Sequence, residues 1–444
     1  MDKSQINALL KRIQNKQITV GVIGLGYVGL PLAYELSSHN VPTIGFEVNT
    51  EKVALLQKGE NYIEDLNNDL VRSVLIKGTL TATDDFSKLA DCDAIYICVP
   101  TPFTPNKDPN IAFIVSASRS IRDNLKSGQI IILKSTTFPG TTEKYVQPIL
   151  EESGLIAGKD FFLAYSPERI DPGNKKWNTR NTPIVVGGIE KNSTKLACEI
   201  TKLAVDKVVA VSSPAIGEME KLLENIFRSV NIALVNEMAQ LCDRIGVNIW
   251  EVVDAASTKP FGFMPFYPGP GIGGHCILID PYYLSWMARE YDFETKFITL
   301  AAETNEEMPF YVSSMVVKEI AKQPISLHSA KVLLLGMAFK KDVNDLRHSP
   351  ALKVAEILLN EGFEMVDYYD PYIPEIRILS NKLFSIKEVN PEVLKKYDVV
   401  VITTDHTIID YNSVAEHSKV VIDTRNACKA ATKRDNIMLL GARS

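Results

Sequence analysis

The chain has few cysteines, no long apolar run and no excess of positive charge. Six cysteines in 444 residues are too sparse for a disulfide framework. No apolar run reaches the roughly 18 residues that a membrane span requires, and the polar start MDKSQINALLKRIQNKQ lacks the apolar core of a signal peptide. With 48 Lys and Arg against 54 Asp and Glu, the formal net charge of −6 disfavours non-specific nucleic-acid binding. These absences predict a cytoplasmic protein without a membrane or nucleic-acid partner.

What remains is the composition of a folded globular chain. Hydrophobic residues make up 45% and charged residues 23%, and at roughly 100–200 residues per domain the length suggests two to four domains. We expect three, covering residues 1–211, 212–325 and 326–444. The predicted fold class is α/β, with two Rossmann-like, doubly wound parallel-sheet domains joined by a central helical domain that contains one long helix.

Short apolar runs bounded by turn residues predict the two sheets. In the first domain the runs are ITVGVIG, VPTIGFE, CDAIYICVP, GQIIILKST, FFLAYSPE and TPIVVGG. In the third they are AKVLLLGMAFK, FEMVDYYDPY, YDVVVITTD and KVVIDTRN. Such runs are typical of buried parallel strands with helices between them.

A long helix is predicted between the sheets. Ser213 can cap it, Pro214 suits its first turn, and Gly246 marks its end. Apolar residues recur between these limits at steps of three and four, so the helix would span about 50 Å. A helix of this length can carry two lobes and pair with a second subunit, and a homodimer is the expected assembly.

A dinucleotide-binding turn follows the first apolar run. In Gly24-Leu25-Gly26-Tyr27-Val28-Gly29 the first glycine allows a tight turn, the second lets a pyrophosphate approach, and the third lets helix pack on strand. Glu47 lies 21 residues beyond Gly26, where its carboxylate can accept the ribose hydroxyls and repel the extra phosphate of NADP. NAD is therefore the expected cofactor. The other residues assigned to its site are Tyr27, Val28, Pro100, Thr101, Ser135 and Thr136.

The stretch Gly269–Pro281 contains the least common pattern in the chain. Four glycines within six residues would let a bulky ligand lie against the backbone. A helix that begins at Cys276 would lower the pKa of its thiol, and Asp280 would lie one turn further on the same face. Composition alone leaves open whether Cys276 is a nucleophile or a small packed residue, and His275 a catalyst or a structural hydrogen-bonding group.

Lys221 and Asn225 are four residues apart in the long predicted helix and so share a face. A lysine and an amide in this arrangement could stabilise a developing oxyanion. A solvated polar stripe explains the spacing equally well, so the pattern does not decide between the two.

Several motifs together resemble the UDP-glucose/GDP-mannose dehydrogenase family of nucleotide-sugar 6-dehydrogenases. They run in the family's order through nearly the whole chain: GVIGLGYVGLPLA, KSTTFPGTT, YSPERIDPGN, EMEKLLENIFRSVNIALVNE, GPGIGGHC and GMAFKKDVNDLRHSP. The resemblance implies a four-electron oxidation in which a sugar CH2OH becomes a carboxylate with two NAD in turn. Cys276 would capture the intermediate aldehyde as a thiohemiacetal and then carry the acid as a thioester until water hydrolyses it.

The same resemblance assigns further roles. Lys221 and Asn225 would stabilise the oxyanion, and Asp280 would position or activate water. Glu168 and Thr136 match residues for proton handling and water placement, although Thr137 competes with Thr136 because STTFPG has one residue more than many relatives. A second family carboxylate falls on Pro172 and is absent.

In the third domain the resemblance implies a UDP-binding lobe with a degenerate glycine turn at Gly336. Without the full fingerprint, a second NAD site is not expected there. Lys340 and Arg347 match residues that face the diphosphate and the sugar. A cation pair suits a phosphate, but a surface-charge role is the competing interpretation. No metal site is assigned.

The sugar is expected to be a UDP-N-acetylhexosamine. GIGGHC and SPERIDPGN stand where relatives that oxidise UDP-glucose usually have GFGGSC and an NPEF segment. Arg169 and His275 could meet the acetamido carbonyl, and Gly273 is also assigned to the substrate site. Within this branch UDP-N-acetylglucosamine is favoured over UDP-N-acetylmannosamine. UDP-glucose, a two-electron oxidation of a hydroxy acid, and a non-catalytic nucleotide-sugar binding protein are the remaining alternatives.

Overall fold

The computed structural model describes residues 1–63, 66–104, 108–170, 174, 176–274 and 276–442, and for residues 276 and 278–280 it describes the backbone alone. The chain separates into two compact units. The first comprises Met1–Glu224 and Tyr282–Asp292, and the second comprises Asn225–Pro281 and Phe293–Ser444. The three-domain division remains a prediction.

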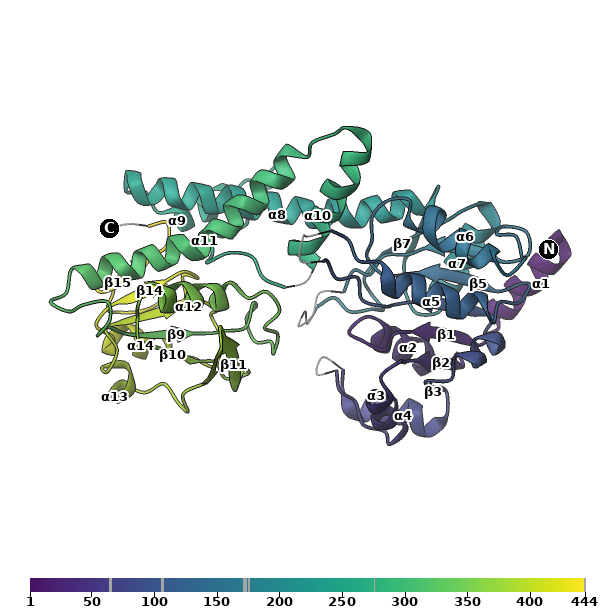
Figure 1. Cartoon of the computed structure of the whole chain (residues 1–444), viewed down its shortest axis with the longest axis horizontal. Coiled ribbons are helices and arrows are strands. Elements are labelled where there is room, and N and C mark those ends of the chain that lie inside the picture. The colour runs from purple at the N-terminus through teal and green to yellow at the C-terminus, as the bar shows by residue number, and fades with distance from the viewer. Residues whose placement is uncertain (64–65, 105–107, 171–173, 175, 275, 443–444) are drawn as a thin grey trace. The chain divides into compact units, whose positions relative to one another are not determined.

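The first unit is built on an eight-stranded sheet in the order β3-β2-β1-β4-β5-β6-β7-β8 (Figure 1). Its strands are β1 (Val20–Ile23), β2 (Thr43–Phe46), β3 (Leu80–Thr83), β4 (Ala94–Ile97), β5 (Ile130–Leu133), β6 (Phe162–Tyr165), β7 (Ile184–Gly188) and β8 (Val208–Val211). Neighbouring strands are parallel, as expected, except that β7 runs antiparallel to β6. The strand order reverses between β1 and β4, and in open α/β sheets such a switch point is where ligands bind.

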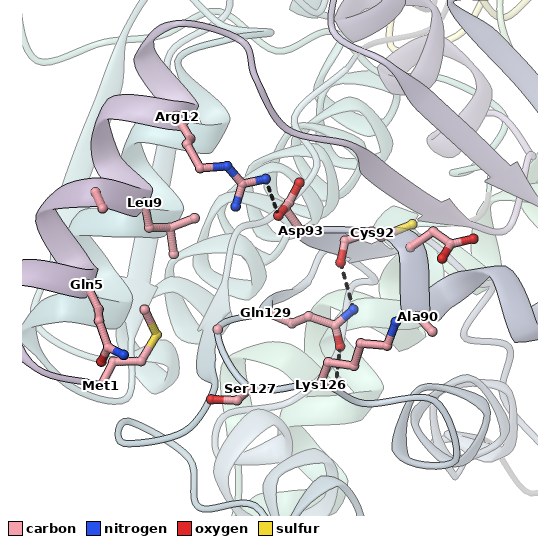
Figure 2. Close-up of a pocket in the computed structure, with 13 residues that line it drawn as sticks. Met1, Gln5, Leu9, Arg12, Ala90, Cys92, Asp93, Lys126, Ser127 and Gln129 are labelled. Atoms are coloured by element: carbon pink, nitrogen blue, oxygen red, sulfur yellow. Dashed lines mark hydrogen bonds and ion pairs between the residues drawn. The ribbon is translucent and has the colours of Figure 1, made fainter.

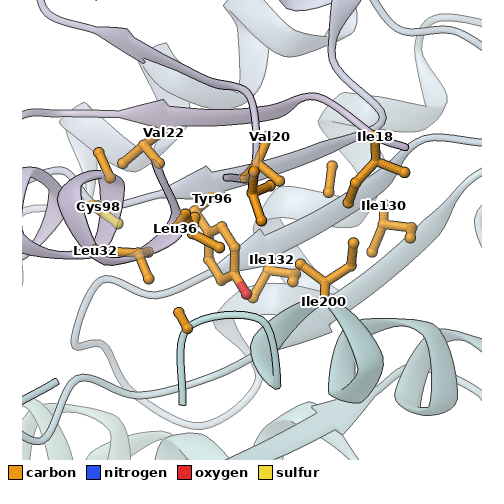
Figure 3. Close-up of a cluster of buried hydrophobic side chains, with 14 of the residues drawn as sticks. Ile18, Val20, Val22, Leu32, Leu36, Tyr96, Cys98, Ile130, Ile132 and Ile200 are labelled. Atoms are coloured by element: carbon orange, nitrogen blue, oxygen red, sulfur yellow. The ribbon is translucent and has the colours of Figure 1, made fainter. Parts of the chain in front are cut away.

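Helices cover both faces of this sheet because its strands are apolar on both sides. The unit contains α1 (Lys3–Gln14), α2 (Gly29–Ser38), α3 (Thr50–Gln57), α4 (Asn68–Lys77), η1 (Phe86–Asp91), α5 (Ala112–Arg122), η2 (Thr142–Val146), α6 (Gln147–Glu151) and α7 (Lys191–Thr201). Ile130 and Ile132 enter the core under α1, α2 and α7, whereas Ile131 and Leu133 enter the core on the opposite face. Figure 3 shows the first of these cores, in which Tyr96 is fully buried.

The second unit contains a smaller parallel sheet in the order β10-β9-β13-β14-β15. Its strands are β9 (Lys331–Leu335), β10 (Met365–Tyr369), β13 (Val399–Ile402), β14 (Val421–Asp423) and β15 (Ile437–Leu439), with a separate hairpin of β11 (Glu375–Ile378) and β12 (Asn381–Phe384). One face packs on α11 (Lys296–Ala321) and α12 (Pro350–Asn360), and the other on α13 (Pro391–Leu394) and α14 (Tyr411–His417). This is the doubly wound arrangement predicted for the third domain.

The predicted long helix is α8 (Pro214–Ile245), and it contributes residues to both units. α9 (Ile249–Ser257) follows it, and α10 (Cys276–Ala288) leads through η3 (Arg289–Tyr291) to α11. None of the helices in the described part of the chain combines the length and apolar character that a membrane crossing requires.

A cavity of about 370 Å³ lies between α1 and the segments that precede β4 and β5 (Figure 2). Its polar groups have protein partners. Arg12 pairs with Asp93 at 2.8 Å, and the Gln129 amide donates to the carbonyls of Leu89 and Cys92. The cavity adjoins the amino ends of the strands, whereas the ligand site of an open α/β sheet lies at the carboxyl ends. A ligand site is therefore expected at the opposite edge of this sheet.

Candidate active site

The glycine turn after β1 has the geometry of a phosphate cradle. Gly24 has φ +88°, and a side chain on Gly29 would place its Cβ 1.8 Å from the Gly24 carbonyl oxygen, so both positions require glycine. A Cβ on Gly26, by contrast, would meet nothing within 4 Å. α2 follows with Val28 at its N-cap and no side chain bonded to its first amides. The open space at Gly26 and these amides suit a pyrophosphate.

Glu47, directly after β2, contacts the same glycine turn. One of its carboxylate oxygens accepts from the Leu25 amide and the other from the Asn49 amide, each at 3.1 Å. The side chain is buried. Each oxygen keeps a further lone pair, so the carboxylate can also accept ribose hydroxyls.

Two loops after β4 and β5 meet beside the switch point. The Ser135 hydroxyl, on the loop after β5, donates to the Val99 carbonyl at 2.7 Å. The fully buried Tyr283, in the second half of α10, donates to the carbonyl of Thr101 and to that of Pro102 at 3.2 Å. Trp286 on the same helix contacts the ring of Phe138. Tyr283 was not among the sequence-predicted residues, and it holds the loop assigned to the cofactor.

The structure separates the two competing threonines. Thr137 is fully buried, and its hydroxyl lies 2.7 Å from that of Thr141. Thr136 is partly exposed. Thr136 therefore has the more accessible side chain, which supports its assignment over Thr137.

Glu168 forms an ion pair that the sequence analysis missed. The Lys134 ammonium lies 3.2 Å from one carboxylate oxygen, and the other oxygen accepts from the amides of Arg169 and Ile170. Both side chains are almost fully buried. Lys134 stands directly after the apolar strand β5, and a charged residue in that position is the signal that could have revealed the pair.

Arg169 is engaged with α8. Its guanidinium pairs with Glu220 and, at 2.8 Å, with Glu224, and it donates to the Pro183 carbonyl. These contacts fasten the segment after β6 to the long helix. A role toward an acetamido group remains a prediction.

Lys221 and Asn225 are both buried in α8. Asn225 accepts a hydrogen bond from Arg228. Lys221 is only 7% exposed as a whole residue, and its ammonium is not among the fully buried polar atoms of the described part of the chain. The two side chains are therefore largely covered by protein, which a solvated stripe would not be.

Glu218, one turn before Lys221, is a fully buried carboxylate that the sequence analysis did not single out. It accepts from the Gly140 amide at 2.6 Å, and from the amide and hydroxyl of Thr142 at 2.9 and 2.7 Å. Burial raises its pKa to about 7, although these hydrogen bonds oppose the shift. Glu218 thus ties α8 to the loop that begins at Ser135.

The glycine loop Gly269–Gly274 packs closely against protein groups of the second unit. The Gly269 amide donates to buried Asn236 at 3.0 Å. A Cβ on Gly273 would lie 2.5 Å from the Cβ of Phe339, and one on Gly274 would lie 3.1 Å from its ring. The absence of side chains that suggested a ligand is thus also required by packing within the second unit.

In the smaller sheet, Asp370 after β10 occupies the place that Glu47 has after β2. Its carboxylate accepts from the amides of Met337 and Ala338 at the degenerate turn, and it lies 3.0 Å from Nε2 of buried His406. Burial opposes ionisation, but the hydrogen bonds from His406 and the backbone outweigh it and lower the pKa of Asp370. Two amides of this turn thus have a protein acceptor.

Lys340 and Arg347 lie on the loop after that turn. The Arg347 guanidinium is exposed and pairs with Asp345 at 2.6 Å, while its carbonyl accepts from the Gly274 amide at 2.9 Å. Lys340 is partly exposed. Their roles toward a nucleotide remain predictions.

Part of the predicted site lies outside the described residues. His275, Pro172 and the side chains of Cys276, Leu278 and Asp280 belong to this group. The helix expected to begin at Cys276 is present as α10. Among the residues described, no group of three or more His, Cys, Asp and Glu side chains could hold a metal ion.

Three family domains match the chain in order. Residues 18–204 match the NAD binding domain of the UDP-glucose/GDP-mannose dehydrogenase family, residues 215–307 its central domain, and residues 333–430 its UDP binding domain. The chain belongs to this family. Membership confirms NAD as the cofactor and assigns UDP binding to the lobe that contains the smaller sheet.

Similar proteins are named for N-acetylated sugars. The UDP-N-acetyl-D-mannosamine dehydrogenase of Pyrococcus horikoshii is 34% identical, over 92% of this chain and 96% of the relative. The UDP-N-acetyl-D-glucosamine 6-dehydrogenase of Pseudomonas aeruginosa is also 34% identical, over 88% and 91%. A solved structure of the Pyrococcus horikoshii UDP-D-ManNAc dehydrogenase superposes with a TM-score of 0.86 at 32% identity, covering 96% of this chain and 99% of that one. These relatives are named as dehydrogenases of UDP-N-acetylhexosamines, some for the mannosamine sugar and one for the glucosamine sugar.

The buried Glu218 carboxyl predicts a pH-dependent stability. Its folded pKa of about 7 exceeds the ordinary value of 4.5, so its favourable contribution is complete below pH 4.5 and is lost as pH rises through 7. Between pH 5 and pH 8 we expect wild type to lose about 2 to 3 kcal/mol of unfolding free energy relative to Glu218→Gln. Urea unfolding of both proteins across this range measures the change. Glu237→Gln, at an exposed carboxylate of α8, is the control, and a pH-independent difference for Glu218→Gln would contradict the prediction.

Proposed function

We propose that this protein oxidises carbon 6 of a UDP-N-acetylhexosamine to the carboxylate, with NAD as the hydride acceptor. The observation that carries the proposal is the loop Gly269–Gly274, which packs on the UDP-binding lobe and precedes α10, the helix that begins at Cys276. A helix N-terminus favours the thiolate form of a cysteine. The proposed nucleophile is thus the first residue of a helix, two residues beyond a loop that packs on the UDP-binding lobe.

The proposed chemistry requires a covalent intermediate. The C6 hydroxyl loses a proton and its carbon loses a hydride, which gives an aldehyde. The aldehyde carbon is sp2, so it cannot pass a second hydride to NAD until a nucleophile has added to it. Addition of the Cys276 thiolate restores an sp3 carbon, and loss of a second hydride leaves a thioester. Water then hydrolyses the thioester and frees the thiol. NAD supplies the hydride-accepting chemistry at both oxidations, so two NADH form for each sugar.

Other residues are proposed to stabilise the oxyanion, to transfer protons and to place the hydrolytic water. Lys221 and Asn225 would stabilise the oxyanion, a role that the burial of both residues in α8 supports. Thr136 and the ion-paired Glu168 would place water and handle protons. Asp280 would position or activate the hydrolytic water.

The sugar itself is the finer part of the proposal. The SPERIDPGN motif favours UDP-N-acetylglucosamine, whereas the names of the relatives support UDP-N-acetylmannosamine equally. A relative from Ralstonia nicotianae, 33% identical over 93% of this chain and 96% of its own length, is named for N-acetyl-D-galactosaminuronic acid. We therefore propose the N-acetylhexosamine class, with the glucosamine sugar as first candidate and the mannosamine sugar as second. The uronate would serve surface polysaccharide synthesis, and we place the reaction in the cytoplasm.

A panel of UDP-sugars tests this assignment. We expect NADH release with one of UDP-N-acetylglucosamine, UDP-N-acetylmannosamine and UDP-N-acetylgalactosamine, and two NADH for each sugar consumed. UDP-glucose is the control and should react at least about tenfold more slowly, because it lacks the acetamido group that a specific site would bind. One NADH per sugar with release of an aldehyde would contradict the four-electron scheme, and a preference for UDP-glucose would contradict the substrate class.

Cys276→Ser tests the covalent scheme. A serine hydroxyl is a far weaker nucleophile than a thiolate, so uronate formation should fall by about a thousandfold or more. Product analysis by mass spectrometry measures it. Cys242→Ser, the same change at a buried cysteine of the second unit, is the control for folding and should retain uronate formation. Normal uronate output from Cys276→Ser would overturn the scheme.

We also propose a homodimer through α8. Eight apolar side chains recur along this helix at steps of three, four and seven residues and are all exposed. They are Ile216, Met219, Leu223, Phe227, Leu234, Met238, Leu241 and Ile245. An apolar stripe of this length is typical of an interface, and a second copy of the same helix matches it in length and pattern.

A charged substitution in the stripe tests the dimer. Leu234→Glu combined with Leu241→Glu places two carboxylates in the apolar face, so the variant should run as a monomer with half the mass of wild type. Size-exclusion chromatography with light scattering measures the mass. Arg244→Glu, which changes an exposed charge of the same helix, is the control and should leave the dimer intact. An unchanged mass for the double variant would refute this interface.

A further inference from the structure

Lys134 and Glu168 form a buried ion pair at the carboxyl edge of the eight-stranded sheet. Lys134 stands directly after β5, and Glu168 lies three residues beyond the neighbouring strand β6. Their side chains are 4% and 11% exposed, and the Lys134 ammonium lies 3.2 Å from Oε2 of Glu168. The ammonium also donates to the Pro167 carbonyl at 3.2 Å, so its place beside the carboxylate is fixed.

The two oxygens of the Glu168 carboxylate are held differently. Oε1 accepts from the amides of Arg169 at 2.7 Å and Ile170 at 2.8 Å. Oε2 is buried and makes no hydrogen bond among the described residues, because its contact with Lys134 is an ion pair without hydrogen-bond geometry. A carboxylate oxygen can accept two hydrogen bonds. Oε2 is therefore the atom with which Glu168 can still bind a water or a substrate hydroxyl.

The surroundings of the pair are poorly solvated. Cys98, directly after β4, is buried, and burial raises the pKa of its thiol to about 12. The charges of Lys134 and Glu168 act on that thiol with opposite signs, so the three groups lie near one another. The guanidinium of Arg169 pairs with carboxylates of α8 instead. A carboxylate buried in such a place binds a proton unless a cation compensates its charge, and among the described residues Lys134 is that cation.

We propose that Lys134 is a positioning residue, which keeps Glu168 in its anionic form and leaves Oε2 as the acceptor for a water or a substrate hydroxyl. The inference rests on the proposed function in that it takes Glu168 as the residue that places water and handles protons. Lys134 acts through Glu168. Its charge keeps the proton off the carboxylate, and the ammonium together with the two amides at Oε1 holds the carboxylate in one orientation before substrate binds.

A double-mutant cycle tests whether Lys134 acts through Glu168. It compares wild type, Lys134→Met, Glu168→Gln and the double variant, with the sugar that reacts fastest in the UDP-sugar panel. Methionine keeps most of the length of the side chain and removes its charge. We expect Lys134→Met to lower kcat at least about tenfold in the wild-type background, but less than about twofold in the Glu168→Gln background. The KM for the UDP-sugar should change less than about threefold, because Lys134 does not bind the substrate in this scheme.

Thermal unfolding of the same four proteins adds a measurement without substrate. Removal of one charge leaves the other buried and unpaired, so each single variant should unfold at a lower temperature than wild type. The double variant has two neutral side chains and should recover part of that loss. If Lys134→Met does not fold, the kcat values of Glu168→Gln and the double variant decide the question. Equal values support the inference, and a further loss in the double variant overturns it.

Two more variants separate charge from packing. Lys134→Arg keeps the positive charge and should retain more of kcat than Lys134→Met, whereas a purely steric role predicts that the larger arginine is the worse replacement. Lys126→Met is the matched control. Lys126 is exposed and precedes the same strand, at the opposite edge of the sheet, so its loss should leave kcat and KM unchanged.

The outcomes separate this inference from the proposed function. A wild-type kcat in Lys134→Met overturns the inference, and so does an equal loss in both backgrounds. A loss confined to KM also overturns it, because Lys134 would then be a binding residue. The proposed function fails separately if wild type forms one NADH per sugar. In that event the cycle, measured on the rate of this NADH formation, still decides whether Lys134 acts through Glu168.

Discussion

Close backbone approach at glycine is the constraint on which both units depend. In the first unit, α2 can follow β1 only because Gly29 faces the Gly24 carbonyl oxygen at a distance that no side chain could occupy. In the second, a Cβ on Gly336 would lie 2.5 Å from Thr404, on the segment directly after β13. The first contact lets a helix follow its strand closely and the second brings two strand ends together, in each case at the carboxyl edge of the sheet.

Each sheet has an acidic residue directly after its second strand, Glu47 after β2 and Asp370 after β10. The two carboxylates bind their glycine turns differently. Glu47 binds a single amide of its glycine turn, through Leu25, and leaves open space at Gly26. Asp370 binds two turn amides with one oxygen and contacts His406 with the same atom. One turn keeps open space for a pyrophosphate at Gly26, whereas two amides of the other turn bind a carboxylate of the protein. The two sheets share a topology, and the family match assigns NAD binding to the first and UDP binding to the second.

The sequence predicted those features that depend on local pattern. Buried runs such as ITVGVIG and YDVVVITTD became β1 and β13, and the helix expected from Pro214 is α8. β3 and the β11–β12 hairpin were missed because their strands are partly exposed and lack a continuous apolar run. Lys134, Glu218, Tyr283 and Phe339 were missed for another reason. Their partners lie between 34 and 182 residues away or, for Phe339, on a glycine that shows no side-chain pattern, so no spacing rule could have joined them.

The first turns of α8 contact several loops at the carboxyl edge of the larger sheet. Gly217 packs against the ring of Tyr165, Glu218 binds the loop at Gly140 and Thr142, and Glu220 and Glu224 hold Arg169. Each of these polar side chains has a protein partner, as buried polar groups must. Lys221 is 7% exposed as a whole residue, yet its ammonium is not among the fully buried polar atoms of the described residues. Its stem is therefore covered by protein while its charged end can still be reached. Under the proposed function this arrangement, more than the four-residue spacing to Asn225, is the physical reason to assign the developing oxyanion to this part of the helix.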